Sequence, residues 1–318
     1  MTTRPLAAIV VACLAAVASI LLLPGRPEAG WHEPFSPTLV APTGADAVGV
    51  RYARLDTGRE DPWRPGNSRV VMVDIRYPAA DGEHPLRHYG LSQHMSELAM
   101  LAWAPDHEEG LGLRRNEVNW LFTTHAHRYA PPRHGSFPVV ALGAPPGGMR
   151  SSFTALAEDL ASHGFVVVTV DHPHDAPYVE LWPTREVVEP QDAVRQLNEA
   201  QKRSVREADL AAVADQVMEL DDEVAPVIAP GCTIVVSGTL AGQAAPLTDD
   251  PMVEAQIAAW YPRVADALDD PLRSVTVAEG RFRTGSAGLR TALTERVTHD
   301  GDCPSARPDT ASVGGGRQ

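Results

Sequence analysis

Two short histidine-containing segments are the first residues whose types and spacing could do chemistry. They are His125-Ala126-His127 and His172-Pro173-His174-Asp175. Imidazoles close to a carboxylate are common transition-metal ligands, so both segments are candidates for a metal site. The second segment follows an apolar run, residues 165–170, and a polar loop at the carboxyl end of a strand can line a pocket without a metal. We favour that simpler interpretation, and we predict no metal site and no cofactor.

Cysteine chemistry is not expected to be the function. The chain has three cysteines, Cys13, Cys232 and Cys303. No two of them form a C-x-x-C pair, and their spacing is not that of the ligands of a structural zinc site. In an oxidising compartment Cys232 and Cys303 could form a disulfide bond, and two free or buried thiols are the alternative.

Composition and charge exclude one large class of function. The chain has 318 residues, 44% of them hydrophobic, and carries 27 basic against 41 acidic residues, a formal net charge of −14. Proteins that bind the phosphates of nucleic acids need a basic face, so an acidic chain argues against a nucleic-acid partner. The length suits one large domain or two small ones.

Alternating strands and helices predict an α/β fold with a mainly parallel central sheet. Residues 69–77 alternate apolar and polar side chains, as in a strand with one covered face. Residues 138–142, 153–163 and 165–170 follow one another as strand, helix and buried strand, which is a βαβ unit, and Gly164 marks the end of its helix. Further helices are predicted at residues 90–104 and 191–223, and further strands at 232–236 and 274–278.

The N-terminus has the pattern of an export signal. Arg4 precedes an uncharged run at residues 6–23, which Pro24 and Gly25 end. We expect residues 1–29 to be a cleaved signal peptide or an uncleaved signal anchor, so that membrane association through residues 6–23 is one of two alternatives. Either way the protein is predicted to be secreted or otherwise extracytoplasmic.

Six segments together resemble the platelet-activating factor acetylhydrolase and lipase branch of the α/β-hydrolases. The most specific is FTALAEDLASHGFVVVTVDHPHDA at residues 153–176. The others are DTGREDPW (56–63), VMVDIRYPA (71–79), WLFTTHAH (120–127), GSFPVV (135–140) and IVVSGTLAG (234–242). The resemblance implies a central sheet flanked by helices and a strand–turn–helix elbow with a serine nucleophile. It also implies an acid and a histidine later in the chain, and two backbone N–H donors that form an oxyanion hole. The implied substrates are carboxylic esters, particularly short acyl chains on phospholipids.

The turn SGTLAG, residues 237–242, stands where the resemblance implies the nucleophile elbow. Such a turn needs small residues on both sides of the nucleophile, and Ser237 and Ala241 meet that need. Thr239 occupies the nucleophile position. Its hydroxyl is retained, but its extra methyl group stiffens χ1 and crowds the path of attack. Ser237 lies two residues too early and is interpreted as a small turn residue.

The resemblance implies two oxyanion donors, and this sequence keeps a backbone N–H at one of the two positions but has a proline at or beside the other. The backbone N–H of Leu240 would provide the first donor. A gapless alignment of residues 137–153 puts the second at or beside Pro146, which has no N–H. Losing one donor costs about 2.7–4 kcal/mol of transition-state stabilisation. Gly147 would donate instead if the loop were shifted by one residue.

The implied acid and base must follow the elbow. His299 is the sole histidine beyond His174, so it is the candidate base in the order of the family, and an exposed polar residue near a frayed end is the alternative interpretation. For the acid we select Asp266, which follows an apolar stretch at residues 257–261. No sequence rule separates it from the other candidates, which are Asp249, Asp250, Asp269 and Asp270. Only residues 274–278 form a convincing strand in this region, so the last third of the sheet is predicted to be remodelled or incomplete.

The sequence therefore predicts an α/β-hydrolase-like domain over residues 30–300, followed by a disordered tail at residues 301–318. Its partner would be a small-molecule ester or phospholipid. Two functions remain open. One is ester hydrolysis with Thr239, His299 and Asp266, and the other is a pseudo-hydrolase that binds a lipid or ester without turnover. The oligomeric state is not predicted.

Overall fold

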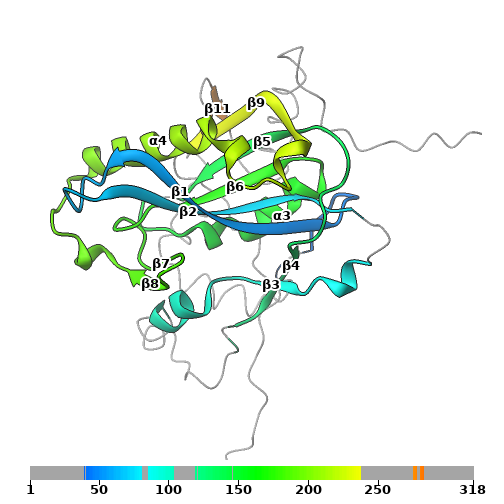
Figure 1. Cartoon of the computed structure of the whole chain (residues 1–318), viewed down its shortest axis with the longest axis horizontal. Coiled ribbons are helices and arrows are strands. Elements are labelled where there is room, and N and C mark those ends of the chain that lie inside the picture. The colour runs from blue at the N-terminus through cyan, green and yellow to red at the C-terminus, as the bar shows by residue number, and fades with distance from the viewer. Residues whose placement is uncertain are drawn as a thin grey trace, which may run out of the picture. The chain divides into compact units, whose positions relative to one another are not determined.

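Figure 1 presents the computed structural model of the chain. It describes residues 39, 41–80, 85–103, 119, 121–144 and 146–237, and two short strands at 275–277 and 280–282. These residues form a nine-stranded sheet of order β11-β10-β9-β5-β6-β2-β1-β4-β3 and a separate hairpin, β7-β8. The strands are β1 (Val48–Glu60), β2 (Ser68–Pro78), β3 (Leu91–Gln93), β4 (Thr123–Arg128), β5 (Phe137–Gly143), β6 (Val166–Asp171), β7 (Val179–Leu181), β8 (Glu186–Val188), β9 (Ile228–Ser237), β10 (Val275–Val277) and β11 (Gly280–Phe282).

The predicted βαβ unit forms the centre of the sheet. Strands β5 and β6 pair in parallel from Val139 opposite Val166 to Gly143 opposite Val170, and helix α3 (Thr154–Ser162) connects them. Every residue of both strands is buried, as expected for parallel strands covered on both faces. Strand β9 pairs in parallel with the other side of β5. The α/β class and the parallel centre are thus confirmed.

Antiparallel strands complete the sheet, so it is mixed. β2 pairs antiparallel with both β6 and β1, and β1 reaches β4 through a short parallel pairing. The prediction that β2 has one covered face was wrong. Its polar residues Asp74 and Arg76 are only 5% and 1% exposed, because they form ion pairs on the face that also carries α3. Strands β1 and β4 were not predicted from the sequence.

Helix α3 ends at the glycine that the sequence predicts. Gly164 has a φ of +91°, which a residue without Cβ adopts at little cost. Its N–H donates to Ala161, and the N–H of Phe165 donates to Leu160. These two bonds form a Schellman motif, which satisfies carbonyls at the helix end and turns the chain into β6.

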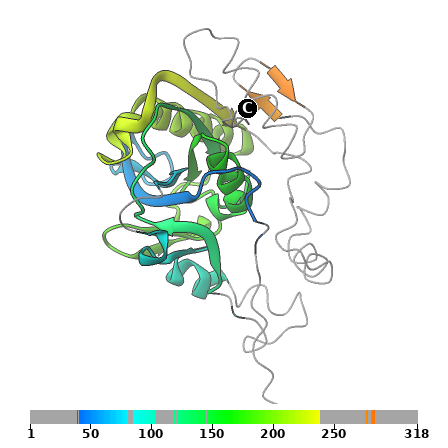
Figure 2. The same ribbon diagram turned by 90° about the vertical axis from the view of Figure 1, so that its right-hand side faces the viewer.

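The two faces of the sheet have separate apolar cores under different helices. Val167 of β6 packs with Leu156, Leu160 and Phe153 of the α3 region. Its neighbours on β6, by contrast, pack with Leu210 of helix α4 (Glu199–Asp215). Because successive strand residues point to opposite faces, α3 and α4 cover opposite sides of the sheet (Figure 1 and Figure 2).

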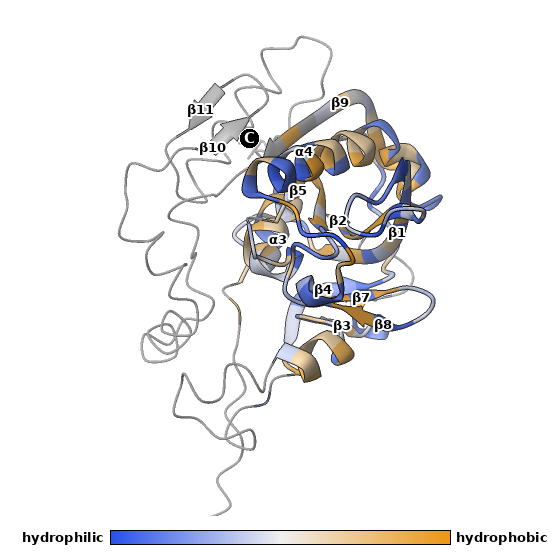
Figure 3. Cartoon of the chain, turned by 90° about the vertical axis from the view of Figure 1, so that its left-hand side faces the viewer, coloured by the Kyte–Doolittle hydropathy of each residue, from blue (hydrophilic) through white to orange (hydrophobic). Residues whose placement is uncertain are grey.

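Two predicted helices are shorter than their patterns indicated. Residues 90–104 were predicted as one helix, but the structure has strand β3 there, followed by helical residues 97–103. Within residues 191–223, α4 begins only after Asn198, whose side chain accepts from Gln201 N–H in a capping box. Short 3-10 turns, η3 (Pro190–Asp192) and η4 (Val217–Glu219), flank it. Figure 3 shows that α4 carries both hydrophilic and hydrophobic residues, as a surface helix does.

Several predictions fall outside the described residues, including the signal segment 1–29 and the tail 301–318. No described helix combines the length and apolar character needed to cross a membrane, and residues 6–23 are not among those described. The predicted strand at 274–278 corresponds to β10, which pairs antiparallel with β9. Cys232 is disulfide-bonded, which decides against a free thiol at that position.

Candidate active site

The carboxyl ends of β5 and β9 meet at one edge of the sheet. Their parallel register sets Leu142 opposite Val236, so the two strands end side by side at Gly143 and Ser237. The loop that leaves β5 and the segment that follows Ser237 therefore start from neighbouring points. In open α/β sheets, ligands bind outside the carboxyl ends of the strands, so this edge is where a site is expected.

The loop after β5 contains the two residues predicted for the second oxyanion donor, Pro146 and Gly147, and the structure describes both. Pro146 is exposed in a turn, and Gly147 is half-buried with a φ of +68°. A proline followed by a residue of positive φ fits a type II turn, in which glycine is favoured at the second position. Pro146 has no N–H to offer, so Gly147 is the first residue after it that could donate.

A buried ion-pair network fixes the far end of this loop. The backbone N–H of Arg150 donates to Asp171 Oδ1 over 2.6 Å, and its guanidinium bonds to both Asp171 and Asp74. Burial alone would lower the pKa of Arg150, but the charges of Asp74 and Asp171 raise it above its ordinary value. Burial raises the pKa of Asp171, although Arg150 opposes that rise. The loop is thus clamped to the end of β6 and to the middle of β2.

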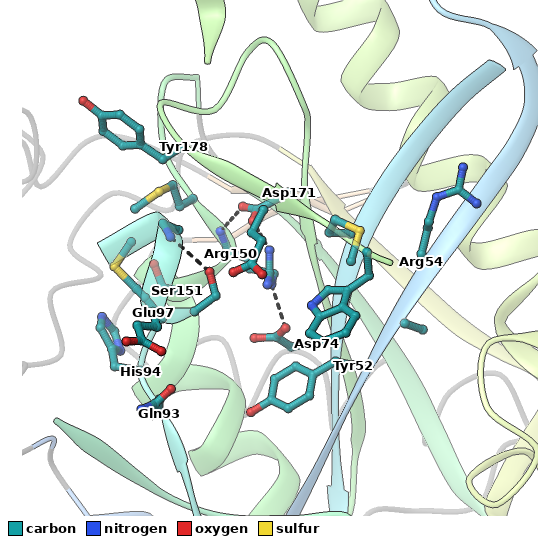
Figure 4. A pocket seen from close by; sticks show the side chains of 18 of the residues that line it. Tyr52, Arg54, Asp74, Gln93, His94, Glu97, Arg150, Ser151, Asp171 and Tyr178 are labelled. Atoms are coloured by element: carbon teal, nitrogen blue, oxygen red, sulfur yellow. Dashed lines mark hydrogen bonds and ion pairs between the residues drawn. The ribbon is translucent and has the colours of Figure 1, made fainter. Parts of the chain in front are cut away.

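A cavity of about 500 Å³ opens beside this clamp. Its walls come from β1, β2, β4, the segment 93–99, the loop exit at 149–151 and the β7-β8 hairpin. Figure 4 shows Arg150 between Asp171 and Asp74, with Gln93, His94, Glu97 and Ser151 together on one side. The buried apolar part of the wall consists of Met72, Met95, Ala99, Met149 and Tyr178. A partly apolar cavity with convergent polar groups next to a sheet edge has the character of a ligand site.

His94 contributes a neutral imidazole to this cavity. Burial lowers its pKa to about 4, with a further lowering by Arg76 that Asp74 opposes. The ring stacks on Phe122 with 4.7 Å between centroids, and Nδ1 is buried without a hydrogen-bond partner. At neutral pH the side chain can therefore exchange a hydrogen bond with a ligand without carrying a charge.

The two histidine motifs of the sequence do not converge on a common point. His125 and His127 hydrogen-bond to the carbonyls of Leu39 and Tyr89 respectively. In the second motif, His172 Nδ1 lies 2.9 Å from Asp209 Oδ2 of α4, and His174 bonds to a backbone carbonyl. Within the described residues, no three His, Cys, Asp or Glu side chains are grouped to hold a metal ion.

Asp209 is the centre of a second buried charge cluster. It accepts hydrogen bonds from Arg69, Arg59 and His172. Burial by itself would raise the pKa of Asp209, but His172 and Arg69 lower it to about 2. Arg69 also donates to the carbonyl of Pro173. This cluster joins α4 to the loop after β6 and lies outside the cavity.

The remaining predicted site residues, Thr239, Leu240, Asp266 and His299, lie outside the described residues. The structure therefore leaves their proposed roles as predictions. Conversely, sequence reasoning missed Asp74, Arg150 and Asp171. One signal was available, since Asp171 ends a strand of five apolar or hydroxyl residues and so had to lie at the edge where ligands bind.

Comparisons with known proteins give a family match over part of the chain. Residues 86–221 match the family model described as platelet-activating factor acetylhydrolase, isoform II. Over this segment, which is less than half of the chain, the protein resembles the platelet-activating factor acetylhydrolase branch of the α/β-hydrolases. The resemblance and the fold class predicted from the sequence are thereby confirmed. The family match includes the Arg150–Asp171 clamp and ends before the predicted elbow at residues 237–242.

Two individual relatives illustrate the likeness. A platelet-activating factor acetylhydrolase of Canis lupus familiaris is 28% identical over 139 residues, which is 40% of this chain and 30% of the dog protein. The chain thus aligns with under a third of that relative's length. A solved structure of a ferulic acid esterase from Streptomyces cinnamoneus is 31% identical, with a TM-score of 0.45, over 57% of this chain and 49% of that one.

Proposed function

We propose that this protein is a carboxylic-ester hydrolase of the platelet-activating factor acetylhydrolase type, acting on short-chain esters or phospholipids. The observation that carries the proposal is the parallel pairing of β5 with β9. It brings the start of the predicted elbow, Ser237, beside the start of the loop that contains Gly147. An acyl-transfer site needs its nucleophile and its oxyanion donors at one such point.

The proposed reaction follows the usual order of acyl transfer. Thr239 Oγ1 attacks the ester carbonyl carbon while His299, oriented by Asp266, takes the hydroxyl proton. The N–H groups of Leu240 and Gly147 stabilise the oxyanion. Collapse of the tetrahedral intermediate breaks the bond to the alcohol, which leaves with the proton from His299. Water then attacks the acyl-threonine by the same steps and releases the acid.

One observation favours a second candidate function, an ester- or lipid-binding protein without turnover. Pro146 is exposed in the turn that follows β5 and has no N–H to donate. Together with threonine in place of serine, this loss would weaken catalysis while the cavity could still hold a ligand. In either case we propose an extracytoplasmic protein, exported or anchored by residues 1–29.

The test is hydrolysis of p-nitrophenyl acetate by the purified chain beside its Thr239→Ala variant. If the esterase proposal is right, the wild type turns over and the variant falls to background, with circular dichroism showing that both are folded. Equal rates in both would overturn Thr239 as the nucleophile. A second test is the double variant Thr239→Ser with Pro146→Gly. It should turn over orders of magnitude faster than wild type if the rest of the site is intact.

A further inference from the structure

Glu180 lines the cavity and has one unsatisfied carboxylate oxygen. It belongs to β7, lines the cavity wall, and is 2% exposed. Its Oε1 accepts a hydrogen bond from Arg185 Nε over 2.7 Å, whereas Oε2 is buried with no hydrogen-bond partner. Leaving a buried carboxylate oxygen unpaired is costly, so a donor is expected to reach it when the cavity is filled.

Two other cavity groups are unpaired in the same way. Ser151 is 5% exposed, and its Oγ is buried without a partner, as is Nδ1 of His94. Both can donate or accept, whereas a carboxylate oxygen only accepts. The strongest demand in the cavity is therefore for a ligand group that donates to Glu180.

The charges around the cavity select a neutral donor over a cationic one. Its wall has four carboxylates, Asp74, Glu97, Asp171 and Glu180. It also has four arginines, Arg54, Arg128, Arg150 and Arg185. An ammonium group would meet as many like charges as opposite ones and would have to lose its water. A hydroxyl group donates one hydrogen bond without that cost.

The apolar part of the wall sets the rest of the ligand. Met72, Met95 and Met149 face the cavity with Tyr178 and are nearly buried. Methionine adapts to irregular shapes, and its sulfur makes favourable contacts with aromatic rings. We propose that this cavity binds a neutral, largely apolar group that bears a hydroxyl, and that the hydroxyl donates a hydrogen bond to Oε2 of Glu180.

This proposal extends the proposed function by naming a part of the ester, but its binding step needs no turnover. It is therefore tested with amides, which an esterase would leave intact. The probes are N-methyl-(4-hydroxyphenyl)acetamide and N-methyl-(4-methylphenyl)acetamide, which differ in a hydroxyl and a methyl group of similar size. Isothermal titration calorimetry on the full chain should give about tenfold tighter binding for the hydroxyl probe.

The Glu180→Met variant removes the acceptor and keeps the length of the side chain. It should lower the preference for the hydroxyl probe to less than about threefold, since its gain came from one hydrogen bond. The matched control is Glu186→Met, which makes the same change at an exposed residue of the β7-β8 hairpin, outside the cavity wall. It should keep the tenfold preference.

Several outcomes would overturn the proposal. They are no binding of either probe to wild type, equal binding of both, or an unchanged preference in Glu180→Met. The wild-type comparison alone decides the matter if that variant fails to fold. Because p-nitrophenyl acetate hydrolysis is measured separately, a preference without turnover leaves this proposal standing and refutes only the esterase. Turnover without a preference for the hydroxyl probe refutes this proposal and leaves the esterase proposal standing.

Discussion

Replacing Arg150 with methionine should destabilise the protein strongly, because two buried carboxylates would lose their cation. The side chains of Asp74 and Asp171 are 6% and 3% exposed. Breaking a buried ion pair by removing one partner costs about 3–5 kcal/mol. Asp74 keeps Arg76 at 3.5 Å, and Asp171 keeps a backbone N–H from residue 150. We therefore expect the lower end, about 3 kcal/mol of unfolding free energy.

The loss should also depend on pH with a definite sign. Burial already holds the pKa of Asp171 above its ordinary value of 3.8, and removing Arg150 raises it further. The native state of the variant then keeps this proton at pH values where the unfolded chain releases it, so the Asp171 carboxyl contributes stability that increases as the pH falls toward its ordinary pKa of 3.8. The deficit relative to wild type should shrink in the same direction.

Urea unfolding followed by circular dichroism would measure both effects. The matched control is Arg54→Met, the same change at an exposed arginine of the same cavity, which should cost no more than about 0.5 kcal/mol. Adding Asp171→Asn to Arg150→Met should recover part of the loss, since the two residues are coupled. If Arg150→Met were no less stable than Arg54→Met, or if its deficit relative to wild type grew as the pH fell, the ion-pair reasoning would be refuted.

Two further predictions concern other parts of the sheet. Because the pKa of Asp209 is lowered to about 2 from 3.8, the unfolded chain binds more protons between those values. This carboxylate should then contribute about 2 kcal/mol that is lost as the pH falls from about 4 to 2. Urea unfolding at several pH values should show that the free energy of unfolding falls less steeply between about pH 4 and 2 in Asp209→Asn than in wild type. An unchanged pH dependence would contradict this role of the cluster. A Cβ at Gly44 would lie 2.1 Å from the backbone carbonyl of Ser162, whereas one at Gly90 meets nothing within 4 Å. Gly44→Ala should therefore lower the free energy of unfolding by roughly 1–3 kcal/mol, which calorimetry would show as a lower unfolding temperature, whereas Gly90→Ala should not. Equal unfolding temperatures for the two variants would count against this packing.

The centre of the fold follows from short-range patterns. Apolar runs at β5 and β6, with an amphipathic helix between them and Gly164 after it, specify a βαβ unit by local chemistry alone. The edges were harder to predict, because β1 alternates irregularly and has charged residues such as Arg51 and Arg59 among its apolar ones. These arginines are paired by acids more than 100 positions away in the chain, namely Asp221 and Asp209. No local pattern reports such a partner.

The cavity was even less accessible from the sequence. Asp74 and Arg150 each resemble an ordinary surface residue until the sheet order sets β2 beside β6. Glu180 lies in a three-residue strand of a small hairpin, which is too short to show a hydrophobic periodicity in the sequence. By contrast, Pro146 and Gly147 were selected because the family resemblance, aligned without gaps over residues 137–153, implies an oxyanion donor in their loop. Sequence reasoning thus located the edge of the sheet but not the wall of the cavity.

The end of β6 connects two parts of the molecule that share no core. Asp171 contacts the Arg150 clamp on the α3 side of the sheet, and the next residue, His172, contacts Asp209 of α4 on the other. Ion pairs and hydrogen bonds depend on direction, whereas apolar packing tolerates sliding. A helix turned by one residue rotates by about 100°, which would carry Asp209 away from its partners. The rotational setting of α4 and the position of the cavity's ion pairs are therefore fixed by two adjacent residues, the last of β6 and the one that follows it, and a displacement of either must strain the other.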